Sequence, residues 1–305
     1  MRNTFVKTLL EIAKADKNVY VVTGDLGFGV LKPFWDELPD QIINAGIAEQ
    51  NMTSVAAGLA LSGKTVFTYS IGNFPTLRCI EQIRNDCAYH NANVKVVCVG
   101  GGFVYGSLGM SHHATEDVAM LRALPGVTVM APGDLVEAEY ATRAIYNTPG
   151  TCYLRLGRGG EQRIHDKIED FCIGKAIKVR DGRDVAILST GAIFIEVKKA
   201  CEQLISEGYN PIVYTFPTVK PIDKQAIVRC AQDARAIVTV EEHNLSCGFG
   251  SAVAEVIADE GLAVKLKRVA VGDVYSSIVG TQDYLRAQYG IDAAHIVDAV
   301  KEILR

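Results

Sequence analysis

The sequence lacks the features that mark metal-binding, membrane-spanning and nucleic-acid-binding proteins. Its eight cysteines form no CxxC pair, so the ligand spacing of zinc and iron–sulfur sites is missing and buried free thiols are expected. The mainly apolar runs, such as residues 94–99, are far shorter than the roughly 18 residues of a spanning helix. Asp and Glu (35) outnumber Lys and Arg (31), the net charge is −4, and there is no basic stripe. These absences predict no nucleic-acid partner and no membrane contact.

The composition is that of an ordinary globular protein. Hydrophobic residues make up 49% of the chain and charged residues 22%, and the first residues contain no continuous apolar segment of the secretory kind. We therefore expect a cytoplasmic protein. The length of 305 residues suggests two domains, since a domain takes roughly 150 residues.

Short β-branched segments alternate with longer segments of helical periodicity along the whole chain. In the first half we predict strands over residues 19–22, 65–69, 94–99, 127–130 and 152–156, and helices over 4–15, 48–61, 76–89, 116–122 and 134–147. In the second half we predict strands over 185–188, 211–216, 236–241 and 264–271, and helices over 194–207, 223–233, 250–258 and 293–304. This pattern predicts an α/β fold with two domains in series, each a mainly parallel sheet flanked by helices. Apolar periodicity stops near residues 160–178, which places the domain boundary there.

Two kinds of motif that could indicate nucleotide or metal binding are incomplete. The glycines at 100–102 follow a predicted strand, but no Gly-Lys-Ser/Thr comes after them. The segment 248–250 has only two of the three glycines of a dinucleotide fingerprint. His112 and His113 are adjacent, so their side chains diverge, and no further ligand motif accompanies them. We expect neither NAD nor a metal at these positions.

A series of ordered segments resembles the transketolase family over nearly the whole chain. Ile42-Ile-Asn-Ala-Gly-Ile-Ala-Glu49-Gln-Asn-Met52 is similar to the region around the glutamate that activates the family's cofactor. Tyr69-Ser-Ile-Gly-Asn-Phe74, Arg78-Cys-Ile-Glu-Gln82 and Gly109-Met-Ser-His112-His113 follow in the family's order. Asp184-Val-Ala-Ile-Leu-Ser-Thr-Gly191 and Val238-Thr-Val-Glu-Glu-His243 resemble its last domain. The resemblance implies a thiamine diphosphate pyrimidine-binding domain over residues 1–165 and a transketolase C-terminal domain over residues 175–305.

Thiamine diphosphate is therefore the implied cofactor, with Glu49 as its activating residue. A carboxyl group on N1′ of the aminopyrimidine favours the imino tautomer, whose nitrogen takes the proton from C2. We expect Glu49, at the start of an Ala-rich helix, to lie in an apolar, partly desolvated pocket beside Ile47 and Met52. The alternative is a glutamate that is favoured at a helix N-terminus only by the helix dipole.

Three further residues resemble the family's cofactor-binding positions. Phe74 corresponds to the aromatic residue that stacks on the pyrimidine, and core packing is its alternative role. Arg78 belongs to the same stretch of the family pattern. Asp25 resembles an Asp-Leu turn that lies near the cofactor at the subunit boundary.

A histidine and two arginines resemble the family's substrate-binding residues. His112 matches the catalytic histidine that faces the thiazolium and the donor substrate. Arg158 and Arg2 resemble arginines that bind a sugar phosphate, and a frayed position near the start of the chain is the alternative for Arg2. In transketolases a histidine and an aspartate in the preceding loop contact the sugar, and loop 100–108 has neither here. The acceptor is therefore left open.

The family's diphosphate-binding module, a Gly-Asp-Gly sequence followed by an Asn, is missing. The Gly-Asp pairs at 24–25, 133–134 and 272–273 are followed by Leu, Leu and Val. Since Mg²⁺ needs oxygen ligands together with the diphosphate, we expect an N-terminal transketolase subunit to supply the magnesium site. This implies the C-terminal subunit of a split transketolase, which transfers a ketol unit between sugar phosphates within a heterotetramer built on a homodimer of this chain.

Other functions stay open at this point. Acyl chemistry like that of 1-deoxyxylulose-5-phosphate synthase or of a 2-oxoacid dehydrogenase β-subunit fits the same pattern, whereas the Gly-Met-Ser-His-His loop favours transketolase. A non-catalytic scaffold subunit is the third alternative, and the retained Glu49 argues against it.

Overall fold

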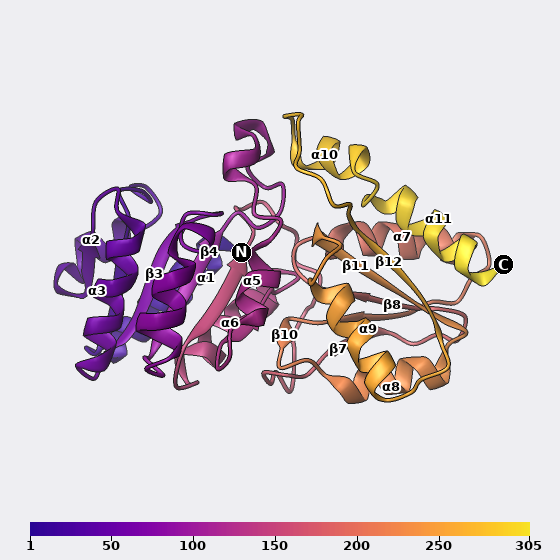
Figure 1. Ribbon diagram of the computed structural model, residues 1–305, viewed down its shortest axis with the longest axis horizontal. Helices are drawn as coiled ribbons and strands as arrows, with labels where there is room; N and C mark the ends of the chain where they lie inside the picture. Colours follow the sequence, from indigo (N-terminus) through magenta and orange to yellow (C-terminus); the bar gives the residue numbers. More distant parts are fainter.

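The computed structural model describes residues 1–305 and arranges them around two sheets. The first sheet has the strand order β10-β5-β6-β4-β3-β1-β2, and the second has the order β12-β11-β8-β9-β7. Figure 1 shows the two sheets side by side along the long axis, with the N-terminus near their junction and the C-terminus at the far end. The predicted α/β fold of two mainly parallel sheets flanked by helices is confirmed.

The first sheet is parallel except at one edge. Its parallel strands are β1 (Val19–Thr23), β2 (Ile42–Asn44), β3 (Thr65–Ile71), β4 (Val94–Val99), β5 (Thr128–Met130) and β6 (Cys152–Leu156). Strand β4 is buried at every position, as expected for a parallel strand covered on both faces. The helices around it are α1 (Arg2–Ala15), α2 (Lys32–Glu37), α3 (Glu49–Leu61), α4 (Ile80–Gln82), α5 (Asp117–Ala123) and α6 (Leu135–Tyr146).

The second sheet contains β7 (Ile177–Arg180), β8 (Ala186–Ser189), β9 (Ile212–Thr215), β11 (Ala236–Asn244) and β12 (Lys265–Val271). Its strands are parallel except β7, which pairs antiparallel with β9. It is flanked by α7 (Phe194–Ser206), α8 (Lys224–Asp233), α9 (Phe249–Asp259), α10 (Gln282–Gln288) and α11 (Ala293–Leu304). Between β9 and α8, β10 (Thr218–Lys220) joins the first sheet, antiparallel to β5. The second half of the chain thus completes the first sheet, while the boundaries at 165 and 175 stay a prediction.

Several details differ from the sequence-based expectations. The predicted helix over 76–89 is a 3₁₀ turn (Leu77–Cys79), α4 and a π-helical segment (Ile83–Ala88). The expectation of buried cysteines is wrong for Cys172 and Cys247, which are exposed, while the other six are buried and all eight are free. No helix combines the length and the apolar composition needed to cross a bilayer.

Candidate active site

The site residues gather at one edge of the first sheet because they follow the carboxyl ends of its parallel strands. Crevices at such an edge are where open α/β sheets bind ligands. In the order of strands β6, β4, β3, β1 and β2, the residues that follow are Arg158, His112, Phe74 with Arg78, Asp25 and Glu49. The structure therefore brings residues that are far apart in the sequence into one row. Arg2 reaches the Arg158 end of the row from the first turn of α1.

Glu49 is the first residue of α3, and its carboxylate is paired with Arg78. The Glu49 side chain is only 5% exposed, and its Oε2 lies 2.6 Å from Nη1 of Arg78, whose side chain is 48% exposed. The expected burial of the carboxylate is therefore found, and Met52 is buried as well. One expectation is wrong: Ile47 is 83% exposed rather than lining an apolar pocket. The partner of the carboxylate is the Arg78 guanidinium instead.

Phe74 connects this ion pair to His112. The guanidinium carbon of Arg78 lies 4.8 Å from the centroid of the Phe74 ring, a cation–π arrangement. The His112 ring meets the same phenylalanine edge-on, with the centroids 5.2 Å apart. Phe74 is half-buried, so its ring is not a core side chain. Glu49, Arg78, Phe74 and His112 thus form one continuous cluster.

The adjacent histidines point in different directions. His112 is half-buried, and its Nδ1 lies 3.1 Å from the hydroxyl of Ser111. His113 is buried, its Nε2 lies 3.4 Å from the carbonyl of Gly106, and burial lowers its pKa. Only His112 is therefore placed to meet a ligand at the strand edge.

Asp25 lies in the turn after β1, next to Glu49. Its backbone N–H donates to the carbonyl of Gly46, and its carboxylate accepts a hydrogen bond of 3.0 Å from Asn44. A Cβ on the preceding Gly24 would be 3.7 Å from the Glu49 carboxylate. Asp25 is exposed, so its carboxylate is accessible to a ligand or a partner protein that binds at this edge of the sheet.

Arg2, Tyr105 and Arg158 form a second cluster at the other end of the row. The guanidinium carbon of Arg158 lies 5.6 Å from the centroid of the Tyr105 ring. The positive charges of Arg2 and Arg158 both act on the Tyr105 phenol. Arg2 is half-buried on α1, so it is not a frayed end. Tyr105 could not be predicted from the family resemblance, because the family contacts the sugar from this loop with a histidine and an aspartate, which loop 100–108 lacks.

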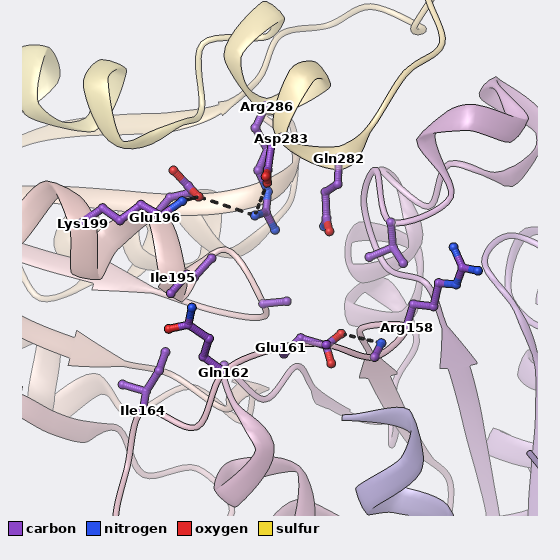
Figure 2. A pocket seen from close by; sticks show the side chains of 15 residues that line it. Arg158, Glu161, Gln162, Ile164, Ile195, Glu196, Lys199, Gln282, Asp283 and Arg286 are labelled. Carbon is purple, nitrogen blue, oxygen red and sulfur yellow. Dashed lines mark hydrogen bonds and ion pairs between the residues drawn. The ribbon is translucent and has the colours of Figure 1, made fainter.

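Arg158 also borders a cleft of about 380 Å³ between the two halves of the chain. Figure 2 shows its guanidinium turned away from the carboxylates of Glu161 and Glu196 on the cleft wall. The other cations there are paired, Lys199 with Glu196 at 2.6 Å and the buried Arg286 with the Glu242 carboxylate at 2.6 Å. Arg155, three residues before Arg158, is likewise buried against Asp117 at 2.7 Å. Arg158, by contrast, has no carboxylate partner, so its guanidinium is available to bind an anionic ligand.

A buried group of Asp134, Glu137 and His165 has the donor types of a metal site. Its oxygens already accept protein hydrogen bonds, however. Asp134 accepts from the backbone N–H groups of Glu137, Ile164 and His165, and Glu137 accepts from that of Gly133. His165 Nε2 lies 2.8 Å from the remaining Glu137 oxygen. The group therefore fixes the segment after β6 onto α6 and leaves no free ligand atoms for a cation.

The described residues fit half of a thiamine diphosphate site. A buried carboxylate beside the half-buried Phe74 ring suits an aminopyrimidine, which needs a polar partner at its edge and an apolar surface for its face. The Arg78 guanidinium covers one face of the Phe74 ring, and because its side chain is half-exposed it is free to turn away from that face. A diphosphate and its magnesium would need further oxygen ligands, and the sequence has no Gly-Asp-Gly module to provide them.

Comparisons with known proteins agree with this arrangement. The transketolase pyrimidine-binding domain matches residues 1–160, and the transketolase C-terminal domain matches residues 174–296. The chain is 38% identical to a putative transketolase C-terminal section of Methanocaldococcus jannaschii, covering 100% of this chain and 96% of that protein. It is also 38% identical to a 6-deoxy-6-sulfo-D-fructose transketolase subunit of a Clostridium species, covering 99% and 94%.

A solved structure described as a split-gene transketolase in an inactive β4 tetramer is similar over 99% of this chain and 97% of that one. Its TM-score is 0.90 and its identity is 32%. The chain belongs to the transketolase family, and specifically to the split subunits that carry the pyrimidine-binding and C-terminal domains. Membership of this family implies thiamine diphosphate as the cofactor and an N-terminal subunit as the partner.

Proposed function

We propose that this chain is the catalytic C-terminal subunit of a thiamine-diphosphate-dependent enzyme that transfers a ketol unit between sugar phosphates. The observation that carries the proposal is the continuous cluster of Glu49, Arg78, Phe74 and His112 at the ligand-binding edge of the first sheet. A scaffold subunit would have no need of a buried carboxylate beside a half-buried aromatic ring at that edge. When bound, thiamine diphosphate supplies the carbon nucleophile and the electron sink for cleaving the donor's C–C bond.

Each residue of the cluster has a role that its position allows. Glu49 would hold and exchange the proton at N1′ of the pyrimidine, because its carboxylate is buried and faces the strand edge. Phe74 would support the pyrimidine face, and Arg78 would orient the Glu49 carboxyl group. His112, edge-on to Phe74, would contact the donor substrate, and Asp25 would contact the cofactor from the turn after β1.

Apolar side chains around this edge are exposed, which supports a covering partner. Phe28 is 69% exposed, Ile47 83%, Leu77 52% and Met110 51%, and they surround the turns that carry Asp25, Glu49, Phe74 and His112. Exposed apolar groups gathered around a site are typical of a protein interface. In the proposed enzyme the N-terminal subunit covers this edge and supplies the magnesium and diphosphate ligands, in a cytoplasmic heterotetramer built on a homodimer of this chain.

The test is to assemble the two subunits and follow cofactor binding and turnover. By calorimetry, this chain alone should bind thiamine diphosphate weakly. On mixing with the N-terminal subunit and Mg²⁺, it should bind tightly and transfer a ketol unit from a ketose phosphate to an aldose phosphate. Each subunit alone is the control for turnover. Micromolar cofactor binding by the isolated chain would contradict the division of the site between two subunits.

The same assembled enzyme distinguishes the alternative acyl chemistry. With pyruvate and an aldose phosphate, an enzyme like 1-deoxyxylulose-5-phosphate synthase would release CO₂, whereas a ketol transferase would need a ketose donor. A complex that binds the cofactor and turns over only with pyruvate would overturn ketol transfer while retaining the cofactor assignment.

A further inference from the structure

Tyr105 lies in the loop that follows strand β4, at the edge of the sheet where the candidate site residues gather. It follows β4 closely in the chain, and its ring packs directly against Gly100, the first residue after that strand. A Cβ on Gly100 would clash with the Cδ2 and Cε2 atoms of the tyrosine ring, and Gly100 has a φ of +95° that other residues rarely adopt. The ring therefore occupies space that a side chain at position 100 would otherwise fill.

The tyrosine is flanked by two arginines that have no carboxylate partner. Arg158 lies over the ring at 5.6 Å, and the Arg2 side chain is hydrogen-bonded to the neighbouring Asn3. By contrast, the nearby Arg155 and Arg286 are both neutralised in buried pairs with carboxylates. Two guanidinium groups without a carboxylate partner beside one tyrosine suit a tetrahedral oxyanion, which accepts several charge-assisted hydrogen bonds.

We propose that Tyr105 is a specificity-determining residue that donates its hydroxyl hydrogen to the terminal oxyanion of the sugar substrate, between Arg2 and Arg158. This inference rests on the proposed function and extends it to a residue outside the family resemblance. The shared chemistry is a tetrahedral anion, either a phosphate or a sulfonate. The packing of the ring on Gly100 would hold the hydroxyl group in place for contact with the anion.

The protonation state of the phenol fits a donor role. Burial raises the pKa of Tyr105 above its ordinary value, and the charges of Arg2 and Arg158 offset this only in part. The hydroxyl group therefore stays protonated at neutral pH and can donate to an anion. Arg158 remains free to bind the same anion, because no carboxylate competes for its guanidinium.

The experiment compares substrates with and without the anion in the assembled enzyme. Tyr105→Phe keeps the ring over Gly100 and removes the hydroxyl group. We expect the ratio of kcat/KM for glyceraldehyde 3-phosphate to that for glyceraldehyde to fall about tenfold, which corresponds to about 1.4 kcal/mol, mainly through a higher KM for the phosphorylated acceptor. The matched control is Tyr89→Phe, which removes a hydroxyl from an 85% exposed tyrosine at the opposite end of β4. It should leave the ratio unchanged.

Competition with small anions identifies the source of the oxyanion. Inorganic phosphate and methanesulfonate are tested as competitive inhibitors of the wild-type enzyme and of Tyr105→Phe. A higher inhibition constant for phosphate supports the proposal with a phosphorylated substrate, and a higher constant for methanesulfonate alone supports it with a sulfonated one. Unchanged constants for both anions, together with an unchanged substrate ratio, would overturn it.

A binding measurement separates this inference from the proposed function. Inorganic phosphate should raise the melting temperature of the assembled enzyme, because a ligand that binds only the folded state stabilises it. Tyr105→Phe and Arg158→Gln should each reduce that rise. If the wild-type complex transfers no ketol unit yet shows the Tyr105-dependent rise, the proposed function fails and the anion site stands. If it transfers ketol units and the rise is independent of Tyr105, the anion role of Tyr105 is wrong.

Discussion

The carboxylate of Glu49 lies 2.6 Å from the guanidinium of Arg78, and the two partners differ sharply in exposure, 5% against 48%. Because of this asymmetry, losing its partner should cost the buried Glu49 more free energy than it costs the half-exposed Arg78. Arg78 can turn into solvent if Glu49 is lost, whereas Glu49 has no other cation beside it. The pair therefore allows a chemical role for Glu49 to be tested apart from its contribution to stability.

The first prediction is that Glu49→Gln slows cofactor activation without unfolding the chain. An amide keeps the volume of the carboxylate but cannot supply a carboxyl proton, so C2 deprotonation should slow by at least about 10²–10⁴-fold. Stability should change little, because the released Arg78 is half-exposed. The assay is hydrogen–deuterium exchange at C2, followed by NMR on the assembled enzyme. Near-wild-type exchange in a folded variant would reject the catalytic role, and a collapsed melting curve would favour the helix-terminus role.

The second prediction concerns the other partner. Arg78→Met keeps a long apolar side chain over Phe74 but leaves the buried Glu49 carboxylate without a cation. Leaving a buried group unpaired costs about 1–3 kcal/mol in the free energy of unfolding. We expect the double variant Glu49→Gln/Arg78→Met to recover most of that loss. Urea unfolding of the wild type, both single variants and the double variant gives the coupling, and equal losses in both single variants would contradict the asymmetry.

The sequence predicted the long elements well, and the residues assigned from it to the cofactor lie close together, although their roles stay predictions. The mainly apolar runs of β4 and β6 predicted their bounds, because strands buried on both faces are nearly continuous in apolar residues; Lys95 and Arg155 are the charged exceptions. Strand β10 could not be foreseen, since its three residues are defined by pairing with β5 from the other half of the chain. Two contacts could not be foreseen either: the ion pair of Glu49 with Arg78, and the packing of Tyr105 on Gly100. Both depend on how turns after the strands are arranged in the folded chain.

The third prediction is that Arg158→Ala weakens the binding of phosphorylated sugars far more than the binding of cofactor. Loss of a charge-assisted hydrogen-bonded pair costs about 1.5–3 kcal/mol, which raises KM roughly 10- to 100-fold if the contact acts equally in the ground and transition states. Steady-state kinetics with a phosphorylated acceptor, alongside calorimetric titration of the cofactor, measure the two effects. Arg183→Ala, which removes an exposed arginine just before β8, is the matched control. An unchanged KM would assign Arg158 a structural role only.

The fourth prediction is a pH-dependent contribution of His165 to stability. Burial lowers the pKa of His165, but its hydrogen bond to Glu137 and the charge of that carboxylate outweigh burial and raise the pKa above its ordinary value. The imidazole also stacks on Phe194 of α7, with the ring centroids 6.1 Å apart, so it joins the two halves of the chain.

A raised folded-state pKa gives stability that is fully present below the unfolded-state pKa of about 6.5 and is lost as pH rises through the folded-state pKa. His165→Gln should therefore lower the free energy of unfolding by about 1 kcal/mol at pH 6, with a smaller difference at higher pH. Urea unfolding across this range measures the difference, and His90→Gln, at an exposed histidine, is the control. A wild-type advantage that grows with pH would show that the pair is not an ion pair in the folded protein.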